Sequence, residues 1–349
     1  MTLFKPLTQA ERNRLVDQWA WALSTKTRPV LVPGEAILAI EAVAASVAGR
    51  GRKFLNIVTG PYGQQFSDWL RSGGADVVDL STPYDCVVTA ATVEEAIKQH
   101  HPDAVAFVQA EAVTGGSNPT EAILAICQQQ HIITIIDAVS AIGAEPVLMD
   151  SWGIDIVVVG AQKALAGPNG ISAVGVSSRG WNFIETNREA PRHSALSLLD
   201  LKNASDYIAP AAANLPILEA RALLSAFEKC EAEGLAAITD RHQRAAASAR
   251  AGVRQLGLKL WQCDARSCSP LVTTVRLAAE QMTITQPVGM VTPGDGALYG
   301  QLLRLNHFGE AACEQRVEEA MRVLAVLAAA PVEAALEAVR KVWVKENED

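Results

Sequence analysis

Short runs of β-branched and other apolar residues alternate with helical patterns between residue 29 and about residue 180. The runs are strand-sized and almost continuously apolar, which is typical of strands that are buried on both faces. Strands that alternate with helices form a largely parallel sheet covered on both sides. We therefore predict strands over 54–58, 75–80, 104–108, 132–136, 154–159 and 171–176, and helices over 36–47, 64–72, 93–99 and 120–130.

A different pattern begins near Asn187, where a polar loop is followed by an irregular connector. Beyond it we expect two long helices between 215 and 255, strands over 271–277 and 302–305, and a helix over 310–327. A chain of 349 residues is longer than one core usually supports. The fold class is therefore α/β, with a mostly parallel large domain and a smaller α+β domain. The expected division is an N-terminal helix or arm at 1–28, a large domain at 29–210, and an interdomain helix with the small domain at 211–349.

The composition narrows the class of partner and the compartment. A net charge of −8 gives no electrostatic reason to bind nucleic acid or an anionic membrane. The six cysteines are scattered and include no CxxC pair, as in proteins of a reducing compartment. The N-terminal stretch carries charges throughout, unlike a signal peptide, and the apolar runs are too short to span a membrane. We expect a soluble, cytoplasmic protein.

The segment 135–178 contains the residues most suggestive of chemistry. Asp137 closes an apolar strand, and Lys163 follows the next strand, 26 positions later. Ligand-binding residues in open α/β sheets lie at such strand ends. Pyridoxal phosphate (PLP) requires a lysine that bonds it covalently and a carboxylate that keeps its pyridine nitrogen protonated. Asp137 and Lys163 suit these two roles.

The same segment resembles the class V aminotransferases, in particular the alanine–glyoxylate and serine–glyoxylate group. The matching positions, in order, are DAV at 137–139, GAEP at 143–146, Asp150, GID at 153–155 and GAQKAL at 160–165. The resemblance covers about residues 29–327 and is close only over 130–178. It implies the PLP-dependent transferase fold of type I.

The resemblance also implies individual roles at the cofactor. Lys163 would bond PLP, and Asp137 would contact the ring nitrogen. Tyr62 would stack on one face of the ring, and Val139 would pack on the other. Gln162 would lie near the cofactor phosphate.

Near the C-terminus, the stretch LLRLNHFGEA resembles the strand whose arginine binds the substrate carboxylate in the family. The corresponding residue is Arg304, whose planar guanidinium suits a carboxylate. The substrates implied are a small amino acid, such as alanine or serine, and a 2-oxo acid, such as glyoxylate or pyruvate. The family also implies a homodimer with the cofactor near the subunit interface.

Three features depart from the family pattern. The turn expected to bind the cofactor phosphate contains Gly34, Glu35 and Ala36, and a carboxylate at Glu35 would repel a phosphate unless it points away. The partner loop that usually contributes to the phosphate has Ala211 and Asn214, of which only Asn214 can donate a hydrogen bond from its side chain. The N-terminal segment, with a helix expected over 9–23, is also shorter than in the family.

Three functions therefore remain open from the sequence. The first is a PLP-dependent aminotransferase. The second is another PLP reaction class, such as a lyase or a cysteine desulfurase, for which Cys268 is the candidate sulfur acceptor. The third is a non-catalytic relative, suggested by Glu35, Ala211 and the short N-terminus.

Overall fold

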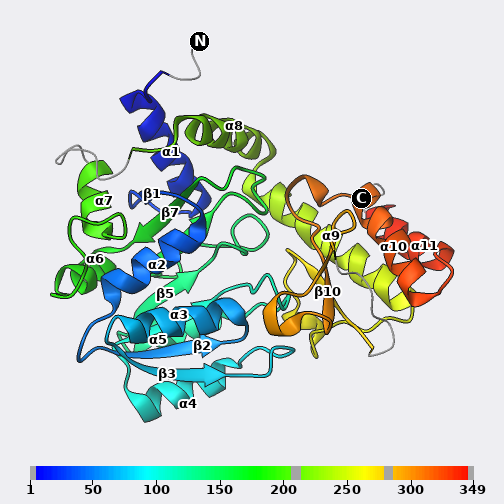
Figure 1. Cartoon of the computed structure of the whole chain (residues 1–349), viewed down its shortest axis with the longest axis horizontal. Helices are drawn as coiled ribbons and strands as arrows, with labels where there is room; N and C mark the ends of the chain where they lie inside the picture. Colours follow the sequence, from blue (N-terminus) through cyan, green and yellow to red (C-terminus); the bar gives the residue numbers. More distant parts are fainter. Residues whose placement is uncertain (1–4, 206–213, 279–285, 345–349) are drawn as a thin grey trace.

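The computed structural model describes residues 5–205, 214–278 and 286–344. Its largest element is a seven-stranded sheet in the order β1-β7-β6-β5-β4-β2-β3 (Figure 1). Strands β2 to β6 are parallel to one another, whereas β7 is antiparallel to both β6 and β1. The bounds are β1 Val30–Pro33, β2 Lys53–Val58, β3 Asp76–Ser81, β4 Ala104–Val108, β5 Ile133–Asp137, β6 Ile156–Gly160 and β7 Ile171–Val176.

Helices cover both faces of this sheet, because its central strands are apolar on both sides. One buried core lies between the sheet and the helices α1 (Gln9–Ala22), α4 (Ala90–His100), α5 (Thr120–Gln129) and α8 (Ile217–Glu233). A second core lies on the opposite face, against α2 (Ala36–Val47), α3 (Pro61–Ser72), α6 (Ser178–Glu185) and α7 (Leu198–Ser205).

A second, three-stranded antiparallel sheet has the order β8-β10-β9, with bounds Thr273–Arg276, Leu302–Leu305 and Val291–Pro293 respectively. It packs with three helices, α9 (Leu235–Gln255), α10 (Glu314–Ala328) and α11 (Glu333–Val344), around a separate core (Figure 1). Among the described residues, no helix has both the length and the apolar character needed to cross a membrane.

The predicted strands and helices are confirmed to within a few residues at their ends. The long helical stretch divides at Gly234, as expected, because this residue has a positive φ of 85° and ends α8. The sequence reasoning did not predict α6, α7 and α11, nor the short strands β1 and β9. Helices α6 and α7 are only 8 residues long, too short for a clear helical period.

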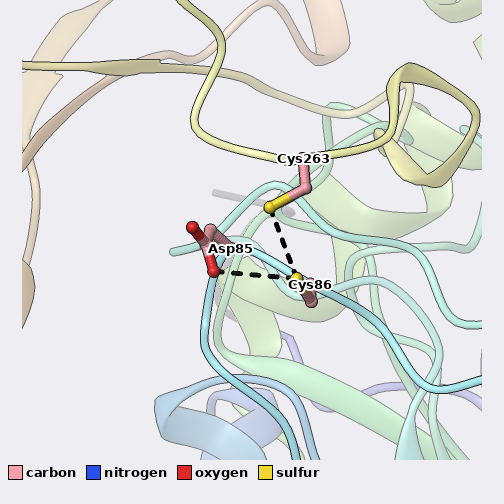
Figure 2. A group of neighbouring side chains, drawn as sticks. All are labelled: Asp85, Cys86 and Cys263. Carbon is pink, nitrogen blue, oxygen red and sulfur yellow. Dashed lines mark hydrogen bonds between the residues drawn. The ribbon is translucent and has the colours of Figure 1, made fainter.

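The two sheets are connected by contacts between the segment that follows β3 and the segment that precedes β8 (Figure 2). The backbone N–H of Cys263 donates to the carbonyl oxygen of Asp85 at 2.9 Å. The carboxylate of Asp85 accepts a hydrogen bond from Arg276 at 2.7 Å. The sulfur atoms of Cys86 and Cys263 lie 3.4 Å apart in the same place.

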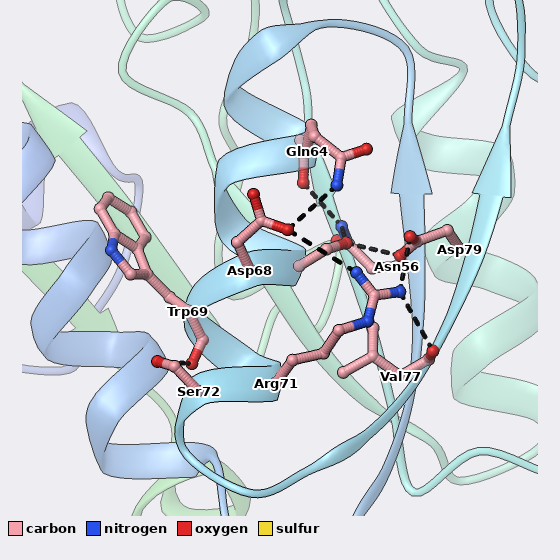
Figure 3. Close-up of polar contacts among 10 residues, drawn as sticks. Asn56, Gln64, Asp68, Trp69, Arg71, Ser72, Val77 and Asp79 are labelled. Carbon is pink, nitrogen blue, oxygen red and sulfur yellow. Dashed lines mark hydrogen bonds and ion pairs between the residues drawn. The ribbon is translucent and has the colours of Figure 1, made fainter.

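A polar network fixes α3 against the strands beneath it (Figure 3). The side-chain amide of Asn56 donates to the hydroxyl of Ser67 at 2.6 Å, and this hydroxyl donates to Asp79 at 2.6 Å. Arg71 completes the network through a 2.6 Å ion pair with Asp79. Because Tyr62 lies in the first turn of α3, the network also fixes the backbone that carries this side chain.

Candidate active site

A cavity of about 360 Å³ lies at the carboxyl ends of the parallel strands, where ligands bind in open α/β sheets. Asp137 is the last residue of β5, and Lys163 follows the end of β6. Six residues predicted for the cofactor site line this cavity together: Glu35, Ala36, Tyr62, Asp137, Val139 and Lys163. The fold thus brings together side chains from four segments that are separated in the sequence.

The amine of Lys163 is held at the centre of this group. Its Nζ donates a hydrogen bond to the hydroxyl of Ser140 at 2.6 Å and lies 5.8 Å from the centre of the Tyr62 ring. Burial lowers the pKa of Lys163, although the neighbouring carboxylates, Asp137 first among them, oppose the shift. A lowered pKa increases the fraction of the neutral amine, which is the nucleophilic and basic form. Sequence reasoning missed Ser140, although it lies next to the predicted Val139.

Asp137 faces the same cavity from the end of β5. Its Oδ1 accepts a hydrogen bond from the backbone N–H of Val139 at 2.9 Å, which fixes the direction of the carboxylate. Burial raises the pKa of Asp137, and the charge of Lys163 and this hydrogen bond counteract the rise. A cationic ring nitrogen at this carboxylate would relieve the cost of burying it.

Glu111 is a further acidic residue that the sequence reasoning did not single out. It is 1% exposed, and its Oε1 accepts a long hydrogen bond of 3.5 Å from the backbone N–H of Tyr62. Its Oε2 has no hydrogen-bond partner among the described residues. Burial, with the nearby charge of Asp137, raises the pKa of Glu111 to about 8. Its position just beyond β4, at the same sheet edge as Asp137, is the signal that could have identified it.

Space for Glu111 depends on Gly60, the residue before α3. A Cβ atom at Gly60 would lie 2.1 Å from Cγ of Glu111, far inside van der Waals contact. A glycine is therefore needed here for close approach, and it allows Glu111 to lie beneath the turn that carries Tyr62.

Glu35, which also lines the cavity, is the N-cap of α2. Its Oε2 accepts a hydrogen bond from the backbone N–H of Ile37 at 2.7 Å. Its Oε1 accepts one from Nε2 of Gln162 at 2.5 Å. A phosphate at this place would require the carboxylate of Glu35 to point away from the turn. These two hydrogen bonds instead hold the carboxylate at the turn. It already bonds to the helix N–H and the glutamine amide, which are donors that a phosphate would otherwise use. Gly34, just before it, has a φ of 147° and donates to the carbonyl oxygen of Gly170 at 2.8 Å.

Four predicted residues lie outside the lining of this cavity. Gly34 and Gln162 are next in sequence to the lining residues Glu35 and Lys163, whereas Arg304 and Asn214 come from more distant segments. Arg304 lies on β10 and forms a 2.8 Å ion pair with the largely exposed Asp295, although its positive charge still lowers the pKa of Lys163. Its Nε is buried and has no partner among the described residues. Asn214 is exposed ahead of α8, and Ala211 lies outside the described residues.

The lining fits one part of PLP better than another. A planar pyridine ring suits the space bordered by Tyr62, Val139, Asp137 and the amine of Lys163. The phosphate end is different, because the carboxylate of Glu35 occupies the N-terminus of α2.

The chain is similar to several known proteins. The family model for class V aminotransferases matches residues 33–283. A pyridoxamine–pyruvate transaminase from Mesorhizobium japonicum is 31% identical, over 88% of this chain and 81% of that protein. An alanine–glyoxylate aminotransferase from Callithrix jacchus is 28% identical, over 84% of this chain and 74% of its own length. The crystal structure of pyridoxamine–pyruvate aminotransferase from Mesorhizobium loti is 28% identical and superimposes with a TM-score of 0.90, covering 97% of this chain and 90% of that one.

Proposed function

The chain belongs to the class V aminotransferase family, and on this basis we propose that it transfers an amino group between a small amino acid of the alanine or serine type and a 2-oxo acid such as pyruvate or glyoxylate. Class V aminotransferases are PLP-dependent enzymes of fold type I. The predicted family, fold class, enzyme class and cofactor are therefore confirmed.

The observation that carries the proposal is the position of Lys163, whose amine lies in one cavity with Asp137 and faces Tyr62. When bound, PLP supplies a pyridine ring that withdraws electrons from the substrate Cα. We propose that Asp137 contacts the protonated ring nitrogen, and that Tyr62 and Val139 pack on the two faces of the ring. Lys163 would bond the cofactor and move the proton at the substrate Cα, because burial favours its neutral amine.

Ser140 and Arg304 complete the assignment. Ser140 accepts the hydrogen bond of the Lys163 amine at 2.6 Å and so positions the base. Arg304 would bind the substrate carboxylate with its guanidinium. In the structure this guanidinium pairs with the exposed carboxylate of Asp295 at 2.8 Å, and the substrate would displace it. The guanidinium of Arg304 is already largely desolvated in its pair with Asp295. Replacing the carboxylate of Asp295 by that of the substrate therefore costs less free energy than forming a new buried ion pair.

The test is the visible absorption spectrum of the purified protein with added PLP, before and after addition of L-alanine or L-serine. We expect an absorption band that requires Lys163 and changes on addition of the amino acid. A band of equal size in Lys163→Ala would contradict the role of this residue. No change with any small amino acid would contradict the proposed substrate class.

Glu35 favours a second candidate function, the transfer of an amino group from pyridoxamine to pyruvate. The Mesorhizobium japonicum relative is named for that reaction. Pyridoxamine carries an uncharged hydroxymethyl group at the position where pyridoxamine phosphate carries a dianionic phosphate ester. A hydroxyl can donate a hydrogen bond to Glu35, whereas a phosphate there would meet a carboxylate that already caps α2.

The two candidates differ in the vitamin B6 compound that binds. Titration of the protein with pyridoxal and with PLP, followed by absorbance, compares the two affinities directly. Tighter binding of pyridoxal, with pyridoxal formed from pyridoxamine and pyruvate, would favour the second candidate. Tighter binding of PLP, with no pyridoxal formed, would exclude it.

We also propose a cytoplasmic homodimer without a nucleic-acid partner, and the division into an arm at 1–28, a large domain at 29–210 and a remainder at 211–349. The net charge of −8 and the free cysteines support the compartment and the partner class. The exposed Asn214 is free to contact a second subunit. A monomer in sedimentation at micromolar concentration would contradict the dimer.

A further inference from the structure

Cys86 and Cys263 form a thiol pair at the contact between the two sheets (Figure 2). Cys86 belongs to the segment between β3 and α4, and Cys263 to the segment between α9 and β8. Their sulfur atoms are 3.4 Å apart, although 177 positions separate them in the sequence. A disulfide bond requires the sulfurs to approach to about 2 Å. Only a small movement is therefore needed to join them.

The backbone around the pair is held in place independently of the sulfurs. The N–H of Cys263 donates to the carbonyl oxygen of Asp85, the neighbour of Cys86, at 2.9 Å. Arg276, on β8, donates to the carboxylate of Asp85 at 2.7 Å and stacks on Trp261, with its guanidinium carbon 4.3 Å from the ring centre. These contacts keep the two thiols opposite each other.

Both thiols can be reached by a small reagent. Cys263 is exposed, Cys86 is partly exposed, and both line an open cavity of about 930 Å³ between the two sheets. This cavity shares no lining residue with the one that contains Lys163. By contrast, Cys127 and Cys230 are buried in the core.

We propose that Cys86 and Cys263 form a reversible disulfide, by exchange with a small-molecule disulfide, that ties the small sheet to the large one. The exposed thiolate of Cys263 attacks one sulfur of the reagent, whose S–S bond breaks and releases one thiol. The thiolate of Cys86 then attacks the sulfur of Cys263 and releases the second thiol. Two protein thiols are oxidised, one reagent disulfide is reduced to two thiols, and their two protons pass to the departing thiolates.

The order of these steps follows from the surroundings of the two sulfurs. The hydrogen bond with Cys263 and burial raise the pKa of Cys86 to about 11, and Asp85 adds to the shift. A thiol with so high a pKa is rarely ionised and attacks slowly while its partner is reduced. Cys263, which is exposed, therefore reacts first.

The same three residues, Asp85, Cys86 and Cys263, lie close enough to hold a metal ion. However, one carboxylate oxygen of Asp85 is already paired with Arg276, a cation that would repel the metal. The geometry thus favours oxidation of the two sulfurs over metal binding.

The disulfide would act on the sheet that carries Arg304. Cys263 lies two residues after Trp261, which donates its backbone N–H to Thr274 on β8, and β8 pairs with β10. A covalent tie at this point restricts movement of β10 relative to the large sheet. This consequence rests on the proposed function of Arg304, whereas formation of the disulfide does not.

The test exposes the reduced, full-length protein to oxidised glutathione, blocks the remaining thiols, and maps the peptides by mass spectrometry without reduction. We expect a linked peptide pair containing Cys86 and Cys263 that dithiothreitol separates. Cys263→Ser should abolish the pair, whereas Cys268→Ser, which changes a cysteine of the same cavity, should leave it intact. Circular dichroism confirms that both variants are folded.

Three results would overturn the proposal: no linked pair, glutathione retained on Cys263 alone, or a pair that includes Cys268 instead. Zinc retained by the purified protein, with both thiols protected from glutathione, would also overturn it.

The expected consequence of the disulfide, restricted movement of β10, has its own test. We expect a fall in kcat/KM of threefold or more after oxidation of the wild type and no fall in Cys263→Ser. An unchanged kcat/KM in a fully linked protein would overturn the consequence. Absence of any aminotransferase activity would instead reject the proposed function and leave the peptide result standing.

Discussion

The side-chain amide of Gln162 donates a hydrogen bond to the carboxylate of Glu35 at 2.5 Å. This contact joins the loop that carries Lys163 to the N-terminus of α2, and Glu35 caps that helix through Ile37. A negative side chain thus occupies the place where class V aminotransferases are expected to bind a phosphate. On the second proposed function, the charge of Glu35 would set which form of vitamin B6 the site prefers.

Glu35→Gln should shift the preference toward PLP. The substitution removes the negative charge and keeps nearly the same shape, so the ratio of the affinities for PLP and pyridoxal should rise about tenfold, equivalent to about 1.4 kcal/mol. Absorbance titration with each compound measures the ratio. Glu121→Gln, at an exposed acid in the first turn of α5, is the matched control and should leave the ratio unchanged. An unaltered ratio in Glu35→Gln would show that its charge does not act on the ligand.

Lys163→Ala should lower the rate of transamination by about a thousandfold or more, because the variant lacks both the cofactor-bonding amine and the base. Single-turnover kinetics with alanine measure the loss. Lys98→Ala, on the exposed face of α4, is the control and should retain the wild-type rate. A loss of less than tenfold would assign the proton transfer to another group.

Asp295→Asn and Arg304→Gln should have opposite effects on the KM for the amino acid. Asp295 competes with the substrate for the guanidinium of Arg304, so its neutral variant should lower KM by a few fold. Arg304→Gln removes the binding group and should raise KM about tenfold or more. Steady-state kinetics separate KM from kcat. A rise of KM in both variants would mean that the ion pair supports the site instead of competing with substrate.

Glu111 should make the protein less stable as the pH rises. Burial raises its pKa from 4.5 to about 8 in the folded state, so the folded protein retains a proton that the unfolded chain loses. The free energy of unfolding should therefore fall between about pH 4.5 and pH 8, by up to about 1.4 kcal/mol per pH unit for this group.

Glu111→Gln should reduce this slope, because glutamine does not titrate. Chemical denaturation at several pH values measures it. Glu145, whose pKa burial raises to about 7, remains in the variant and accounts for part of the residual slope. An equal slope in both proteins would show that Glu111 is ionised in the fold at neutral pH.

The sequence predicted the architecture of the large sheet because its signals are local. Apolar runs such as 104–108 are buried on both faces, and this requirement is visible in the residues themselves. Asp137 and Lys163 were found for a related reason. Each follows a predicted strand, and the carboxyl ends of parallel strands meet at one edge of a sheet.

The direction of individual side chains was decided by the tertiary structure. The sequence showed that Glu35 stands in the turn before α2, but Gln162, 127 positions away, determines where its carboxylate points. Glu111 becomes a strongly perturbed acid only in the folded chain, where it is buried near the charge of Asp137.

The thiol pair of Cys86 and Cys263 is likewise invisible in a chain where 177 positions separate the two residues. Strand and helix patterns arise from the burial of neighbouring residues, so one sequence suffices to predict them. Hydrogen bonds, pKa values and thiol contacts depend on atoms that only folding brings within a few ångströms.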